Sequence, residues 1–293
     1  MQAQITKIKN LLLYLLGFVV GCDIHLAPIF VVAFALCWIA EGNLKKKLSA
    51  FVSNKYALLL VLFYVLHIIG LIYTPDKAAG GFDLQVKLSM LIFPIMLVSE
   101  GEMSFGRQKL FIESFVAGLC MGGLICLGYG CWRYFTEHVV VFEYMKFSIF
   151  HHPSYYSMYI DTALVMMFYL LTRKVAELKK WEKIFLISAT FFLAFMLVLL
   201  ESKSGLIISI VVFLALFTRF IIMTKRWYLG LAIVSGIVVL GALTYIYVIK
   251  PQGSRFSVAM DALSGKQVDT KSTESTQARL FVWQSAWTLI KTV

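Results

Sequence analysis

Charged residues are scarce in this sequence of 293 residues. Asp, Glu, Lys and Arg together make up 15% of the chain, whereas hydrophobic residues make up 60%. Soluble domains carry about 25% charged residues, so a water-soluble fold of this composition would lack the polar surface to cover its core. Many apolar runs approach the roughly 20 residues that cross a bilayer as a helix. Because backbone groups in lipid must be satisfied internally, the sequence predicts an all-α, polytopic membrane helical bundle.

Motifs of common soluble enzymes are absent as well. The sequence contains no GxxxxGK[ST], GxGxxG, HExxH or GxSxG pattern, and no Asp-x-Asp pair that could hold a divalent metal beside a nucleotide-sugar. Its five cysteines form no CxxC pair and no Cys/His metal spacing. We therefore expect no metal and no cofactor.

Nine apolar runs divide the chain. They cover residues 11–22, 26–40, 56–73, 84–99, 110–132, 154–172, 184–200, 205–222 and 229–249. With a cytoplasmic N-terminus, 16 of the 27 basic residues fall in inside segments, and every short inside loop is basic, as the positive-inside rule requires. This pattern predicts about nine spans in the cell inner membrane, and it explains the net charge of +11 without a nucleic-acid partner.

The end of the chain has a different character. Residues 250–278 are polar, and the following segment places Leu280, Trp283, Trp287 and Ile290 at helical spacing on one face. We therefore expect a transmembrane bundle over residues 1–249. Residues 250–293 would begin a large periplasmic loop whose amphipathic helix lies on the outer membrane surface.

The segment Glu201-Ser-Lys-Ser-Gly205 joins two spans on the predicted outer side. It can be a tight turn in which Ser202 or Ser204 caps the next helix. It can also be a binding site, because free N–H groups at a helix N-terminus, together with Lys203, suit a phosphate-bearing ligand.

Two arginines in the predicted outer loop are further candidates for phosphate binding. A guanidinium presents a planar fork that binds phosphate in a bidentate manner. Arg255 is also explained as ordinary loop charge, whereas Arg279 begins the amphipathic segment.

A candidate polar site stands at the predicted outer mouth of the sixth span, at His151, His152 and Asp161. The histidines could act as acid or base near neutral pH, although a helix that starts at a proline often carries such residues without a catalytic role. Asp161 lies about two turns into the bilayer, where a carboxylate is costly and indicates either a cavity or a partner such as His67.

These motifs resemble those of a known family. Ser202-Lys203-Ser204-Gly205-Leu206 resembles the Ser-Arg/Lys-x-Gly element of the O-antigen ligase and O-antigen polymerase superfamily. Residues 275–287 resemble the part of its large periplasmic loop in which an Arg, a short apolar run and a Trp lead into a helix. His152-Pro153 before the sixth span fits the same pattern, and the resemblance covers about residues 50–290.

The resemblance implies a metal-independent glycosyltransferase of lipopolysaccharide or polysaccharide biosynthesis. It would move a glycan from undecaprenyl diphosphate to a hydroxyl on an acceptor glycan or lipid. Lys203 and Arg279, with Arg255 as a weaker match, would bind the diphosphate, whose charge grows as it leaves. Family members continue into further spans and carry a histidine base after the loop. The family's C-terminal part is therefore expected to be missing here, and no catalytic residue is assigned.

Two other functions remain open. A transporter or flippase for a lipid-linked sugar would use polar residues near the bilayer midplane, such as His67 and Asp161. A non-catalytic membrane scaffold would tolerate alanine at Lys203 and Arg279.

Overall fold

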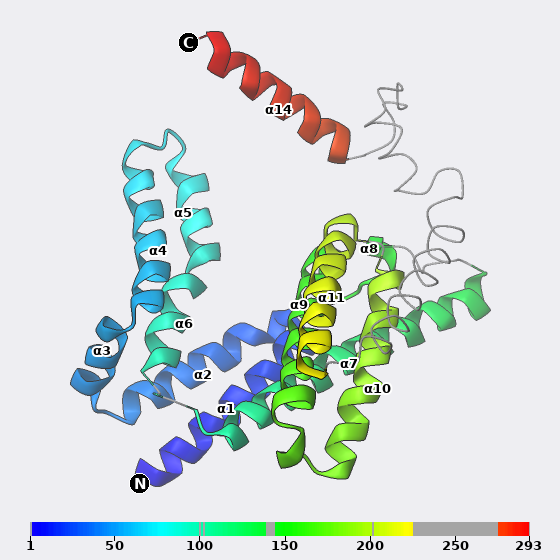
Figure 1. Ribbon diagram of the computed structural model, residues 1–293. Helices are drawn as coiled ribbons and strands as arrows, with labels where there is room; N and C mark the ends of the chain where they lie inside the picture. The colour runs from blue at the N-terminus through cyan, green and yellow to red at the C-terminus, as the bar shows by residue number, and fades with distance from the viewer. Residues whose placement is uncertain are drawn as a thin grey trace. The chain divides into compact units, whose positions relative to one another are not determined.

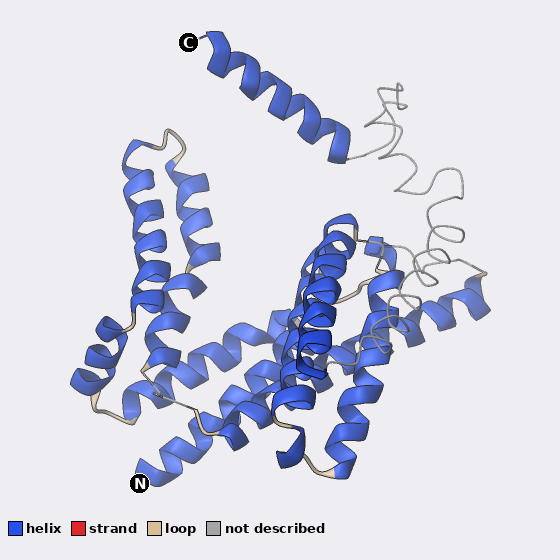
Figure 2. Ribbon diagram, viewed as in Figure 1, coloured by secondary structure: helices blue, strands red, loops and turns tan. Residues whose placement is uncertain are grey.

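The computed structural model describes residues 2–99, 101, 103–138, 144–200, 202–224 and 275–292. Every regular element in these ranges is a helix (Figures 1 and 2). The chain divides into two compact units, residues 1–200 and 201–293, and each is described by itself. The all-α prediction is thus confirmed for the described residues.

Six described helical stretches are long and apolar enough to cross a membrane. They are α1 (Gln2–Cys22), α4 (Lys55–Tyr73), the pair α5 (Lys77–Lys87) and α6 (Ser89–Val98), α7 (Phe105–Glu137), α10 (Lys180–Leu199) and α11 (Lys203–Thr224). A seventh is obtained if α2 (Ala27–Ala40) and α3 (Leu44–Ser53), bent by 113°, count as one broken span. The protein is therefore a multi-pass membrane protein.

The structure supports several membrane spans but does not confirm the predicted count of nine. The run 229–249 lies outside the described residues. The helix α9 (Pro153–Arg173) has the necessary length but carries Asp161, and it is not among the helices apolar enough to span. The predicted run 84–99 begins too late, because α5 starts at Lys77; α6 continues through Pro94.

Glycines bring α1 and α7 into close contact. A Cβ on Gly21 of α1 would stand 2.7 Å from the backbone nitrogen of Leu119, and one on Gly122 of α7 would stand 3.1 Å from the carbonyl oxygen of Cys22. Small residues allow membrane helices to approach at backbone distance. The contact buries one face of each helix.

The helices α2, α9 and α10 pack on this pair, whereas α3, α4, α5 and α6 pack chiefly on one another. The short η1 (Ile24–Leu26) turns the chain from α1 into α2, which packs back on α1 as a helical hairpin. The helices α9 and α10 pack on α7 and on each other, after α8 (Tyr144–Phe147) and η2 (Val175–Glu177) respectively. Apolar side chains fill this contact, among them Leu119, Ile160, Met167, Leu170, Leu186, Leu193 and Met196.

In the second unit the structure describes α11 and α14 (Ser275–Thr292). The helix that the sequence predicts after residue 278 is therefore present. The large apolar side chains of α14 that the structure describes are exposed, with Trp283 at 69% and Trp287 at 60%. Docking of this helix on a membrane surface remains a prediction.

Candidate functional site

The helices of the first unit carry different polar residues at their two ends. Gly17 lies against Phe111 and Gly122 against Cys22, so α1 and α7 run parallel and begin at the same end. An ion pair of 2.6 Å joins Lys109 to Glu182, and α10 therefore begins there too. We call this the basic end; it carries Lys9, Lys47, Arg107, Lys109, Lys174 and Lys179.

A buried ion network closes the basic end where α2 stops. Glu41 accepts hydrogen bonds from Lys9 at 2.6 Å and Thr6 at 2.8 Å, and it pairs with Lys47 at 2.9 Å. Lys9 is only 2% exposed. Burial by itself would raise the pKa of Glu41, but the hydrogen bonds from Lys9 and Lys47 lower it to about 2. Each charge in this network is thus paired with an opposite one.

The opposite end of the unit carries histidines. His151 stands between α8 and α9, is only 6% exposed and reaches across to the end of α1. Its Nε2 lies 3.2 Å from the carbonyl oxygen of Gly21, and since a carbonyl only accepts, Nε2 carries the proton. Ser148 donates to the His151 carbonyl at 2.6 Å and fixes the loop. We call this the histidine end; it carries Asp23, His25 and His151.

The other ring nitrogen of His151, Nδ1, is buried. Nδ1 has no hydrogen-bond partner within the described part of the chain. The ring packs on Tyr156 and Tyr159, with centroids 5.1 and 5.7 Å away. Burial lowers the pKa of His151, so the imidazole is neutral at pH 7 and its Nδ1 is a hydrogen-bond acceptor.

Asp23 and His25 complete the histidine end in the turn after α1. The Asp23 carboxylate accepts the backbone N–H of His25 at 3.0 Å and lies 2.8 Å from His25 Nδ1. Burial would raise the pKa of Asp23, yet the hydrogen bonds from His25 hold it below its usual value. In the sequence these residues stand between the apolar runs 11–22 and 26–40, and an Asp-x-His directly after an apolar run is the signal that points to them.

The candidate polar site of the sequence analysis divides in the structure. His152 is exposed and caps α9, where its Nδ1 accepts the N–H of Ser154 at 3.3 Å. Asp161 is buried, at 3% exposure, two turns into α9, and Ser157 one turn before it is also buried. His151 and Asp161 therefore both point inward, whereas His152 does not belong with them.

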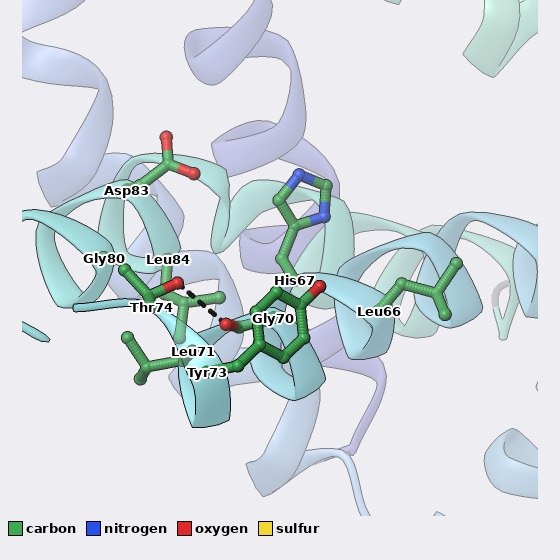
Figure 3. Close-up of a pocket in the computed structure, with 9 residues that line it drawn as sticks. All are labelled: Leu66, His67, Gly70, Leu71, Tyr73, Thr74, Gly80, Asp83 and Leu84. Carbon is green, nitrogen blue, oxygen red and sulfur yellow. Dashed lines mark hydrogen bonds between the residues drawn. The ribbon is translucent and has the colours of Figure 1, made fainter. Parts of the chain in front are cut away.

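His67 lines a separate pocket between α4 and α5 (Figure 3). The pocket has a volume of about 320 Å³. His67 Nδ1 donates to the carbonyl of Phe63 at 2.9 Å, and Thr74 donates to that of Gly70 at 2.8 Å. Asp83, on the α5 side, pairs with Lys87. The pocket is polar, and its lining residues do not include Asp161 or the residues proposed to bind phosphate.

A second pocket, of about 470 Å³, lies at the basic end where α7 and α10 begin. Arg107, Lys109, Glu113, Trp181 and Glu182 are among its lining residues. The pairing of Lys109 with Glu182 neutralises part of its charge.

Lys203 is the first residue of α11. The hydroxyl of Ser202 accepts the N–H of Gly205 at 3.2 Å and so caps the helix, which was one of the two interpretations of this segment. Arg279 lies in the second turn of α14. The side chains of Lys203 and Arg279 lie outside the described part of the structure, as does all of Arg255.

Among the described residues, no group of three or more His, Cys, Asp or Glu is arranged to hold a metal ion. No family model matches the chain, and neither a curated protein nor a solved structure matches it.

Proposed function

We propose that this protein transfers a glycan from an undecaprenyl-diphosphate carrier to a hydroxyl acceptor at the periplasmic face of the inner membrane, in O-antigen ligation or polymerisation. One observation carries the proposal: Lys203 opens helix α11 directly after its Ser202 cap, inside the element that resembles the superfamily motif.

A lysine at a helix N-terminus is suited to the leaving group of this reaction. The first turn of α11 has backbone N–H groups without helical acceptors, and its dipole is positive at that end. The Ser202 cap takes the N–H of Gly205, and a bound phosphate would use other N–H groups of this turn. Together with a fixed cation they would stabilise the charge that develops on the departing diphosphate.

Chain connectivity supports the sidedness of the proposal. Helix α10 begins at the basic end, where Glu182 pairs with Lys109, and Met196 packs beside Gly123 in the second half of α7. It therefore runs away from the basic residues, and Lys203 follows its last residue by four positions. With the basic end in the cytoplasm, Lys203 would face the periplasm.

Arg279 would supply the second cation. It lies in the second turn of α14, in the Arg-to-Trp segment that resembles the family's periplasmic loop. Arg255 would be an auxiliary cation in the same loop.

The test uses the full-length gene product in cells that lack their own copy. Lys203→Ala and Arg279→Ala should abolish the surface-glycan ladder and cause lipid-linked glycan to accumulate, while the protein remains in the membrane fraction. Lys291→Ala, on the same helix as Arg279, is the matched control and should leave the ladder intact. A normal ladder from both cation variants would refute the site.

Transport of a lipid-linked sugar is the second candidate, and buried Asp161 favours it. An ionisable residue inside a membrane helix often marks a substrate or proton path. Asp161→Asn would then trap the lipid-linked glycan on the cytoplasmic side, whereas loss of transfer would leave it on the periplasmic side. Accessibility of the trapped glycan to an added glycosidase distinguishes the two.

A further inference from the structure

Helix α3 presents three chemically different faces. Lys47 and Phe51 are each 7% exposed and face the protein. Leu44, Leu48 and Val52 follow one another at intervals of four residues and are 49%, 57% and 56% exposed. Residues at this spacing form one stripe along a helix, so α3 has an apolar stripe that nothing in the described structure covers. The stripe consists of Leu44, Leu48 and Val52.

The third face of α3 is polar. Lys45, Lys46, Ser49 and Ser53 are all exposed and lie on the side away from Phe51. Lys45 follows Leu44 directly and therefore borders the apolar stripe. A buried face, an apolar face and a basic face on one helix are expected where protein, hydrocarbon and water meet.

The attachment of α3 holds this orientation. The helix is bent by 113° from α2. Lys47 pairs with Glu41 at the bend, and its ammonium lies 4.6 Å from the ring centroid of Trp38. Because Lys47 is anchored in this way, α3 cannot turn about its axis without breaking a buried ion pair.

The depth of α3 follows from its neighbour in the chain. Only Asn54 separates α3 from α4, which is long and apolar enough to span the membrane. Asn54 caps α4 through the N–H groups of Tyr56 and Ala57. The end of α3 is therefore at the membrane surface, and the exposed lysines exclude a deeper position.

We propose that α3 lies in the plane of the membrane at the basic end and binds anionic phospholipids, with Leu44, Leu48 and Val52 among the acyl chains and Lys45 and Lys46 on the headgroup phosphates. Lysine stems can lie along the apolar layer while their ammonium groups reach the phosphates. A second copy of the chain is a poorer occupant, because pairing two such stripes would bring the lysines of both copies together.

A fluorescent amino acid inserted by codon suppression at position 48 or 49 tests the orientation and leaves the five cysteines in place. The full chain is reconstituted into phosphatidylcholine bilayers that contain phosphatidylglycerol. Position 48 should be quenched by a lipid-borne nitroxide and shielded from aqueous iodide, and position 49, the matched control, should show the reverse. Quenching of position 48 by iodide would overturn the proposal. Shielding from both quenchers would also overturn it, because protein and not lipid would then cover the apolar stripe.

Binding of anionic headgroups by Lys45 and Lys46 is tested by titrating phosphatidylglycerol into the same bilayers. The midpoint, the phosphatidylglycerol concentration that gives half of the fluorescence change at position 48, should rise about fivefold for Lys45→Gln. It should rise by a similar factor for Lys46→Gln, since each lysine near an anionic surface contributes about 1 kcal/mol. Lys180→Gln, an exposed lysine that begins α10 at the same end, should leave the midpoint unchanged. Equal midpoints in all variants would show that α3 does not bind anionic headgroups.

Discussion

Gly118 faces Phe18 so closely that a Cβ on Gly118 would stand 2.0 Å from the Phe18 carbonyl oxygen. The two helices thus touch through backbone at the middle of their contact. One turn further along, the same contact brings the Gly21 carbonyl to His151. The position of the histidine end therefore depends on the absence of a side chain at residue 118.

Gly118→Ala should separate α1 from α7 and destabilise the protein by about 1–3 kcal/mol, the usual cost of overpacking. Gly128→Ala is the matched control on the same helix, because a Cβ there would meet nothing within 4 Å. Thermal unfolding in detergent should show a lower midpoint for the first variant only. Equal midpoints would mean that the backbone contact can relax without cost.

The Glu41 network should make stability sensitive to acid. The pKa of Glu41 is about 2 in the folded protein and near 4.5 when unpaired, so the unfolded chain binds its proton first. The stabilisation is complete above about pH 4.5 and is lost as pH falls toward 2. Glu41→Gln should remove this part of the pH dependence.

At pH 7, Glu41→Gln should itself cost about 3 kcal/mol, because it leaves the buried ammonium of Lys9 without a countercharge. The substitution Glu177→Gln removes an exposed ion pair with Lys174 and should cost much less. Denaturant unfolding of the two variants gives the comparison, and similar midpoints would contradict the role assigned to Glu41.

His151 should contribute a second, milder pH dependence. Burial lowers its pKa in the folded state, so the unfolded chain binds the proton first and stability falls as pH drops below about 6.5. His151→Gln removes the titration and can still donate to Gly21, so its midpoint should vary less between pH 7 and 5. An unchanged slope in His151→Gln would contradict the contribution assigned to this histidine.

Conservative exchange of the two proposed cations should have unequal effects. Lys203→Arg keeps a charge at the start of α11 and should retain part of the transfer activity. Arg279→Lys loses the planar fork that binds phosphate in a bidentate manner and should lose more. Transfer rates with the same lipid-linked donor measure the difference, and a reversed order would contradict the assignment of Arg279.

Local pattern was enough to predict much of this protein. Apolar run length predicted α4, α7, α10 and α11, because a lipid-exposed helix must be apolar along its own sequence; for α1 it predicted only residues 11–22, the second half of the helix. The Ser202 cap and the α14 helix also followed from short-range spacing. Whether the run of residues 26–40 spans the membrane was harder to predict, because an apolar stretch of about 14 residues can end in a sharp bend.

Tertiary structure decided which polar groups meet. His151 and Gly21 are 130 positions apart, and Lys9 and Glu41 are 32 apart. No periodicity within one helix encodes such pairs, since they depend on which helices pack and how closely. The sequence by itself determined that the chain is a set of membrane helices with a basic side; only packing through Gly118 and Gly21 decided that His151 is buried and neutral while His152 faces outward.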